Sequence, residues 1–375
     1  LSLDKMAMGG LYDQLGGGFA RYSTDKYWLA PHFEKMLYDN ALLIEVYCKA
    51  YSITNNIFYK NIVDETIKWL LREMTSENFT FFSAQDADSE GVEGKFYTWT
   101  TKELKDILQQ DFELFALHYQ IAEDGNWEHT NILFYKNHLT DIKSQKIINQ
   151  CNHTLFEIRN KRIKPLTDDK ILLGWNALMN KALCIAFLTF NEKKYLDNAK
   201  KNMEYILSKM KNDDYLYFHT SKNNIHKIPA LLDDLAYLTD ALYYLHIATA
   251  NSHYLAKEKE IIMYIEKHFA KNEDVLFDYS NHDFKNIFIN KKEIHDGALP
   301  SSNSILCQSL LKCGYVFNEQ KWIDKANQML SNMKVSFVNY PLSFAIWCKI
   351  FLQKEQDEKQ IIIIGKNAQK YILAM

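Results

Sequence analysis

The stretch GGGFARYSTDKYWLAPHFEKMLYDNALLIEVYCKAY, residues 16–51, decides the predicted fold. Its first half is crowded with polar and aromatic side chains, and its second half is mostly apolar. Pro31 suits the first position of a helix, because the N–H that proline lacks would have no intrahelical partner there. We therefore expect a helix from about Pro31, with a buried body and an N-terminal end that faces a pocket.

Apolar residues recur with helical periodicity along most of the chain, which contains few proline and glycine residues. The helical segments are expected at 35–53, 56–74, 101–119, 140–161, 175–190, 193–210, 231–250, 253–270, 302–317, 320–334 and 341–353. Short β-like runs lie between some of them. The segments between residues 83 and 174 fit the rest of the pattern poorly. The whole pattern indicates an all-α protein made of helical hairpins.

The hairpins also repeat. In each, a polar residue opens the first helix and an aromatic residue opens the second at nearly the same spacing: Asn40 and Tyr59, Asn176 and Tyr195, Asp234 and Tyr254, Asn303 and Trp322. Such self-similarity marks units that bury their apolar faces against one another. The first helix of each hairpin is apolar nearly all round, and the second is amphipathic. This pattern predicts an inner ring of first helices and an outer ring of second helices. We predict an all-α (α/α)6 toroid, one domain over residues 1–375, with short β-hairpins in the loops on one face.

If the inner helices run parallel, their N-terminal ends share one face. The polar clusters HFEKMLYDN, GWN, LLDD and HDGALPSSN lie at those ends. The positive ends of the helix dipoles favour anionic or polyhydroxyl ligands there. The repeat also predicts that its first unit starts upstream of Leu1, so the chain is expected to be part of a longer polypeptide.

Composition excludes several classes of function. A net charge of -3 and a pI of about 6.5 provide no electrostatic footprint for nucleic acid. The 6 cysteines form no C-x-x-C pair, which favours reduced thiols in a cytoplasmic protein over disulfides or a zinc site. No signal peptide is visible, and the uncharged apolar run 182–190 is too short to span a bilayer. Zinc, nucleophile-elbow and phosphate-loop motifs are absent, so neither a metal nor another cofactor is predicted.

Two acidic motifs are candidates for catalysis. In SAQDADSEGVEGKFYTW, Asp86 and Asp88 start like a calcium loop, but Tyr97 occupies the place of the bidentate glutamate. A surface hairpin and a pocket loop are both consistent with this motif. In LLDDLAY, helix capping explains one of Asp233 and Asp234, and the other is a candidate general acid or base.

Other motifs supply a histidine and sugar contacts. His32 has Glu34 and Tyr38 nearby, and a histidine beside a carboxylate can shuttle a proton near neutral pH, although a structural role is the commoner one for such a residue. Trp175 suits a stacking platform or core packing, and Asn176 a helix cap. The remaining candidates, which either reach a ligand or shape a turn, are Asp296 and Asn303.

At GGLYDQLGGGFARYSTDKYWLAPHFEKMLYDNALL the chain resembles the thioredoxin-domain-containing, YyaL-like family, which includes spermatogenesis-associated relatives. The blocks SAQDADSEGVEGKFYTWT, KILLGWNALM, LLDDLAYL and DGALPSSNS match further family blocks in the same order. The resemblance implies a thioredoxin-like domain upstream and a six-hairpin toroid similar to N-acylglucosamine 2-epimerases and six-hairpin glycosidases. The chain departs from the family at Ala177 and Ser302, where glycine is usual, and both positions border the expected pocket.

We therefore expect a cytoplasmic, carbohydrate-active toroid, a sugar epimerase or isomerase that transfers a proton next to a carbonyl. The expected catalytic residues are His32, Glu34, Asp86, Asp88, Asp233 and Asp234. The expected substrate contacts are Arg21, Tyr22, Tyr38, Asp39, Trp175, Asn176, Asp296 and Asn303. Two alternatives stay open. One is a glycoside hydrolase that pairs Asp88 with Asp233 or Asp234, and the other is a non-enzymatic glycan- or protein-binding domain that works with a thioredoxin-like domain.

Overall fold

The computed structural model describes residues 1–214, 216–271, 274–284, 290–356, 361, 363, 365 and 369. The chain divides into two compact units. Unit 1 comprises Leu1–Ser76 and Phe81–Asp169, and unit 2 comprises Glu77–Thr80 and Lys170–Met375. Both are mainly helical, with very short strands between helices, which confirms the predicted all-α hairpin architecture.

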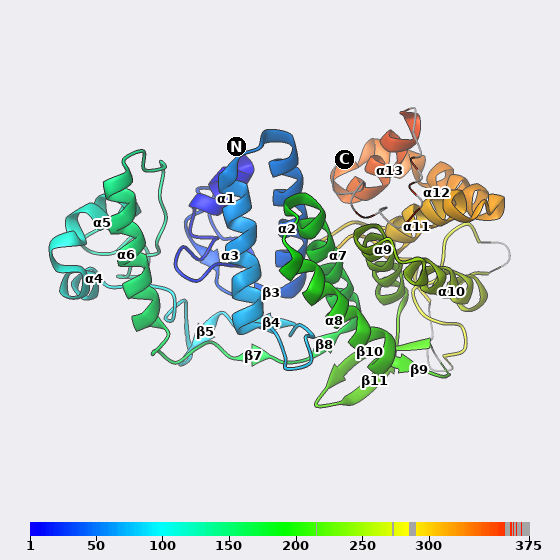
Figure 1. The fold of residues 1–375 in the computed structure, drawn as a ribbon, viewed down its shortest axis with the longest axis horizontal. Helices are drawn as coiled ribbons and strands as arrows, with labels where there is room; N and C mark the ends of the chain where they lie inside the picture. The colour runs from blue at the N-terminus through cyan, green and yellow to red at the C-terminus, as the bar shows by residue number, and fades with distance from the viewer. Residues whose placement is uncertain are drawn as a thin grey trace. The chain divides into compact units, whose positions relative to one another are not determined.

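Unit 1 contains one long helical hairpin and a smaller helical group. Its helices are α1 (Ser2–Met8), α2 (Leu37–Thr54), α3 (Ile57–Glu73), α4 (Thr101–Leu108), the 3-10 turn η1 (Gln109–Asp111), α5 (Phe112–Tyr119) and α6 (Ile142–Arg159). Its strands are β1 (Tyr22–Ser23), β2 (Pro31–His32), β3 (Lys35–Met36), β4 (Ala84–Gln85), β5 (Asp88–Ser89), β6 (Val92–Glu93) and β7 (Thr167–Asp168). Helices α2 and α3 lie side by side (Figure 1).

Unit 2 contains three hairpins in succession and a final helix. Its helices are α7 (Leu173–Phe190), α8 (Lys193–Lys209), α9 (Leu232–Thr249), α10 (Ser252–His268), α11 (Ser302–Phe317), α12 (Gln320–Asn339), the 3-10 turn η2 (Pro341–Phe344) and α13 (Ala345–Glu355). Its strands are β8 (Ile171–Leu172), β9 (Lys211–Asn212), β10 (Leu216–Lys222) and β11 (Ile225–Pro229). Helix α9 packs against both α7 and α11, and α8, α10 and α12 each pack against their own partner (Figure 1). This is the predicted division into inner and outer helices.

All four hairpins have the same two-residue connection. The residue after the inner helix adopts a left-handed conformation with φ of 53–55°: Asn55, Asn191, Ala250 and Asn318. Asparagine tolerates this conformation better than most residues, which accounts for three of the four. The identical connection gives the sequence repeat its structural basis.

The polar residue of the repeat joins each inner helix to the chain around it. Asn40 donates to and accepts from the backbone of Phe19, and Asn303 does the same with Phe277. Asn176 donates to the Leu172 carbonyl and accepts from Asn202. All three asparagines are fully buried. We call these positions, together with Asp234, the junction residues.

Two predicted helix boundaries are wrong. Pro31 does not start a helix, because residues 31–36 are extended: β2 pairs with β1, and β3 pairs with β4, which in turn pairs with β7. Helix α2 begins only at Leu37. Proline's fixed φ suits an edge strand as well as a first helical turn. The second error is the helix expected at 101–119, which is interrupted at Gln109, where φ is 46°.

Helix α7 is, among the described helices, the one with the length and apolar composition of a membrane span. This differs from the expectation from the sequence, which considered only the uncharged run 182–190. Most of the helix, 78% of the apolar window, is buried inside the protein. It includes Lys181, which is paired with Asp240. This is the position of an inner helix packed on all sides.

The junction amide of Asn303 is expected to be important for stability. An Asn303→Ala variant leaves the Phe277 N–H and the Glu293 carbonyl without their partner inside the protein. We expect the free energy of unfolding to fall by about 2–4 kcal/mol, because each unpaired buried group costs about 1–3 kcal/mol. Urea denaturation measures this change in the free energy of unfolding. Asn198→Ala, on the outer surface of α8, is the control, and an equal effect of both substitutions would contradict the assignment.

Candidate functional site

In unit 1, polar side chains gather at the N-terminal end of α2. Strands β1 and β2 place Tyr22 opposite His32, and their rings stack with centroids 5.3 Å apart. Arg21 Nη1 lies 3.1 Å from Glu34 Oε2, which is 3.8 Å from His32 Nε2. Arg21 also forms a hydrogen bond with Tyr38. The structure therefore brings together the unit 1 residues predicted from residues 16–51.

The carboxylate that forms a hydrogen bond with His32 is not one of the residues predicted from the sequence. Glu93 Oε1 lies 2.7 Å from His32 Nδ1. Glu93 sits on β6, opposite Asp88 on β5. Asp88 and Asp86 are exposed, and the Asp86 carboxylate accepts a hydrogen bond of 3.4 Å from the backbone of Asp88. The acidic loop therefore supplies Glu93 to the histidine, while Asp86 and Asp88 shape a surface hairpin.

Asp39 is the unusual carboxylate of this cluster. It directly precedes the junction residue Asn40 and is partly buried. Burial raises the pKa of Asp39 to about 7, and the nearby charge of Arg21 opposes the shift. Its Oδ2 atom is buried and has no hydrogen-bond partner. Asp39 can thus gain or lose a proton near neutral pH.

In unit 2, the starts of α7, α9 and α11 lie together. Asp234 Oδ1 accepts from the backbone of Gly174 in α7, and its Oδ2 accepts from the Leu231 backbone just before α9. The hydroxyl of Tyr237 donates to the carbonyl of Pro300, just before α11. A Cβ on Gly174 would lie 3.1 Å from Asp234 Oδ1, which explains the small residue at this position.

His219, on β10, is held by Asp234. Its Nδ1 lies 2.7 Å from Asp234 Oδ2. Burial would lower the pKa of His219, but the hydrogen bond and the charge of Asp234 outweigh it, so the pKa is raised. The carboxylate is almost completely buried and the imidazole is about a quarter exposed. Asp234 therefore positions an imidazole that remains accessible.

Asp233 is next to this pair and has a different environment. Burial raises the pKa of Asp233 to about 7, helped by the charges of Asp234 and Glu293. Tyr279 forms a side-chain hydrogen bond with Asp233, while Asp233 Oδ1 has no partner. Adjacent carboxylates thus differ: Asp234 is fixed by hydrogen bonds, and Asp233 exchanges its proton near pH 7.

The other predicted residues of unit 2 occupy varied positions. Trp175 is partly exposed, as a stacking platform requires. Asn176 and Asn303 are completely buried junction residues, and neither is the helix cap or ligand contact that the sequence indicated. Asp296 accepts hydrogen bonds from the Ser301 and Ile346 backbones and so shapes the starts of α11 and α13.

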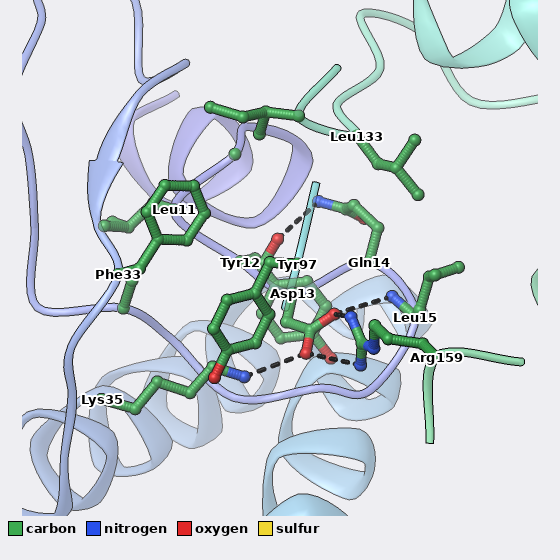
Figure 2. A pocket seen from close by; sticks show the side chains of 13 residues that line it. Leu11, Tyr12, Asp13, Gln14, Leu15, Phe33, Lys35, Tyr97, Leu133 and Arg159 are labelled. Atoms are coloured by element: carbon green, nitrogen blue, oxygen red, sulfur yellow. Dashed lines mark hydrogen bonds and ion pairs between the residues drawn. The ribbon is translucent and has the colours of Figure 1, made fainter. Parts of the chain in front are cut away.

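Figure 2 shows a pocket in unit 1 in which Asp13 lies between two cations. Arg159 contacts both carboxylate oxygens, at 2.7 and 2.9 Å, and Lys35 Nζ lies 3.0 Å from Oδ2. Burial alone would raise the pKa of Asp13, but the charges of Arg159 and Lys35 hold it well below its usual range. The cavity is about 30 Å³, which is large enough to hold water.

This buried cluster holds the backbone of the glycine-rich loop, residues 15–17, by hydrogen bonds. Asp13 Oδ1 accepts from the backbones of Leu15 and Gly16, and Lys35 Nζ donates to the Gly17 carbonyl. The three charged groups bind one another and the loop, so we assign the cluster a structural role.

The sequence reasoning missed His219, Tyr279, Glu293 and Glu93. His219 directly follows Phe218 in the short aromatic strand of its repeat, yet the equivalent positions after Phe82 and Phe277 are Ser83 and Asp278. Repetition therefore gave no signal for a histidine. Glu93 has a signal in hindsight, because Gly91 and Gly94 flank a hairpin that returns it toward the chain.

No family model matches the chain. It is 27% identical to spermatogenesis-associated protein 20 of Rattus norvegicus over 416 residues, which cover 97% of this chain and 52% of that protein. The human protein of the same name is also 27% identical, over 98% of this chain and 53% of its own length. The chain is a distant homologue of spermatogenesis-associated protein 20. It spans about half the length of these relatives.

Among solved structures, the cellobiose 2-epimerase of Spirochaeta thermophila is similar, with a TM-score of 0.50 and 10% sequence identity. The match covers 87% of this chain and 80% of that one. This likeness supports a mainly helical fold with small β-hairpins, which the chain shares with (α/α)6 toroid proteins, in agreement with the prediction.

The Asp13 cluster provides a test of its structural role. Asp13→Asn leaves Lys35 and Arg159 buried with no counter-charge from Asp13, and removing one partner of a buried ion pair costs about 3–5 kcal/mol. We expect the free energy of unfolding, measured with urea, to fall by that amount. Glu65→Gln, which breaks the exposed pair with Lys68, should cost less than about 1 kcal/mol. A loss as small as this control in Asp13→Asn would refute the structural assignment.

Proposed function

We propose that the chain is a sugar epimerase or isomerase that transfers a proton at the carbon next to a carbonyl. The observation that carries the proposal is the pair of proton-exchanging groups in unit 2. His219 is oriented by Asp234, and Asp233 beside them has a pKa of about 7. Epimerisation requires one group to remove a proton and one to return it, and groups with pKa values near the working pH do both efficiently.

The roles follow from the environments. Asp233, once deprotonated, is the general base, because its pKa of about 7 lies near the working pH. His219 is the general acid, since Asp234 stabilises the imidazolium and leaves the second ring nitrogen to donate. Asp234 is the positioning residue. Trp175, partly exposed at the start of α7, is proposed to stack on the sugar ring.

The cluster of unit 1 supports a second proton-transfer centre. His32 forms a hydrogen bond with Glu93, just as His219 does with Asp234. Asp39, like Asp233, has a pKa of about 7. Arg21, Tyr22 and Tyr38 are proposed as sugar contacts, because their polar and aromatic side chains surround the histidine.

Glycoside hydrolysis is the alternative that one observation favours. Asp233 and Glu293 are close enough for the charge of one to raise the pKa of the other, which is how paired carboxylates acquire separate roles in hydrolases. Release of reducing sugar from a glycan, abolished by Asp233→Asn and by Glu293→Gln, would favour this alternative. The third alternative, a glycan- or protein-binding domain partnered by a thioredoxin-like domain, requires no turnover.

The proposed setting is cytoplasmic. None of the six cysteines, all of which lie in the described part of the chain, forms a disulfide, and five of them are buried. Burial raises the pKa of Cys151 to about 11 and raises that of the Cys184 thiol further, so these groups remain protonated and unreactive near neutral pH. Free, unreactive thiols support a reducing compartment.

Isotope exchange tests the proposed reaction. The protein is incubated in heavy water with N-acetylglucosamine, mannose and cellobiose, and deuterium at carbon two is measured by NMR. We expect exchange in at least one sugar, and a loss of about 100-fold or more in Asp233→Asn and in His219→Gln. His268→Gln is the matched control, because His268 also contacts an aspartate, Asp283, at 2.8 Å, and neither residue belongs to the proposed site. Absence of deuterium from every sugar would count decisively against the proposal.

The pH dependence provides a second test. Asp233 must lose its proton to act as a base, so the exchange rate should rise with pH through about 7. His219 must keep its proton to act as an acid, so the rate should fall again at higher pH. We expect a bell-shaped profile, which His219→Gln reduces to its rising limb. A rate independent of pH between 5 and 9 would exclude both roles.

A further inference from the structure

The cluster at the start of α9 contains more negative than positive groups. Asp234 and Glu293 both act electrostatically on Asp233, and His219 interacts with both aspartates. His219 is paired with Asp234. Among the described residues, no lysine or arginine lies within ion-pair distance of Asp233 or Glu293. Unit 2 therefore has carboxylates here whose charge its described side chains leave uncompensated.

Hydrogen-bond acceptors are also unsatisfied at this place. Asp233 Oδ1 and Ser302 Oγ are buried without a partner. Ser302 is completely buried at the first position of α11, and its backbone N–H donates to Glu293 Oε2 at 3.2 Å. Unpaired buried polar atoms are costly, and they are typically explained by a water molecule or a ligand that the site is built to receive.

We propose that Asp233, Glu293 and Ser302 form a subsite for a protonated primary amine, so that the preferred ligand is an amino sugar with a free amino group. This inference rests on the proposed function, because it specifies the substrate of the same site. An ammonium group has three hydrogens to donate and one positive charge. Its three N–H donors match two carboxylates and one hydroxyl in number, and its charge is opposite in sign to that of the carboxylates. Hydrogen bonds between charged groups are the strong ones.

Other ligand groups fit the same atoms less well. An anionic group would be repelled by two carboxylates, and the backbone N–H groups near the starts of α9 and α11 that could attract it are already used, at Leu231 by Asp234 and at Ser301 by Asp296. A divalent cation requires several oxygen or nitrogen ligands around one point. Among the described residues, no group of three or more such side chains is placed to hold one. An N-acyl amide has no charge to offer.

The repeat supports a ligand role for this position. Asp233 and Ser302 directly precede the junction residues Asp234 and Asn303, and Asp39 directly precedes Asn40 in unit 1. All three carry a buried polar atom without a partner. The same place in different repeats thus keeps an unsatisfied group while the next residue is fully bonded.

Calorimetric titration near neutral pH tests the inference with glucosamine, glucose and N-acetylglucosamine as ligands. We expect glucosamine to bind about tenfold or more tightly than the two neutral sugars, because hydrogen bonds between charged groups are stronger than neutral ones. Glu293→Gln and Asp233→Asn should each remove this preference, and Ser302→Ala should weaken it. His268→Gln should keep it, and circular dichroism of each variant reports whether it folds.

The outcomes separate this inference from the proposed reaction. Equal binding of glucosamine and glucose overturns the amine subsite, even if neutral sugars exchange deuterium. A glucosamine preference that survives both Glu293→Gln and Asp233→Asn also overturns it. Preferential and Glu293-dependent binding of glucosamine without any deuterium exchange supports the subsite and removes the epimerase proposal instead. Binding of Ca²⁺ alone that depends on Asp233 and Glu293, with no amine preference, would replace the amine by a metal ion.

Discussion

The structure depends on the junction residues, each of which ties the start of an inner helix to the neighbouring chain by buried hydrogen bonds. An asparagine suits this place because its amide both donates and accepts, as a backbone peptide does. Asn40 and Asn303 each exchange two hydrogen bonds with a single backbone residue, Phe19 or Phe277. A buried group that satisfies a neighbour's backbone fixes the position of the helix start, since any displacement would leave unpaired polar atoms.

One repeat departs from this rule, and it is a repeat for which we propose acid/base chemistry. A carboxylate at the junction can accept but not donate, so Asp234 binds the Gly174 and Leu231 N–H groups and takes its third hydrogen bond from His219. In this repeat a carboxylate takes the place of the asparagine amide, and it holds the imidazole of His219 by a hydrogen bond. Burial raises the pKa of the neighbouring Asp233, and the same negative charge adds to this effect. Asp234 therefore belongs both to the hydrogen bonds that fix the helix start and to the proposed proton-transfer site.

Buried charge serves different purposes in the two units. In unit 1 the Asp13 carboxylate has two cations and two backbone N–H groups, so all its acceptor atoms are used and the cluster holds a loop. At the start of α9 the carboxylates outnumber the cations, and Asp233 keeps an unpaired oxygen. Saturated clusters of this kind are structural, whereas an unsaturated cluster with a pKa near neutrality is the usual composition of a functional site.

The sequence by itself determined the hairpins, their inner and outer helices and the positions where each inner helix begins to within a few residues. Helical periodicity and the repeat are local properties, readable at Asn40, Asn176, Asp234 and Asn303. It also indicated that Arg21, Tyr22, His32 and Glu34 would lie together, because they are close in the chain. Only the tertiary structure decided that Pro31 belongs to a strand, that Glu93 binds His32, and that His219 and Glu293 accompany Asp233. These pairings join residues distant in sequence, and their energetics depend on burial and neighbouring charge, which no local pattern encodes.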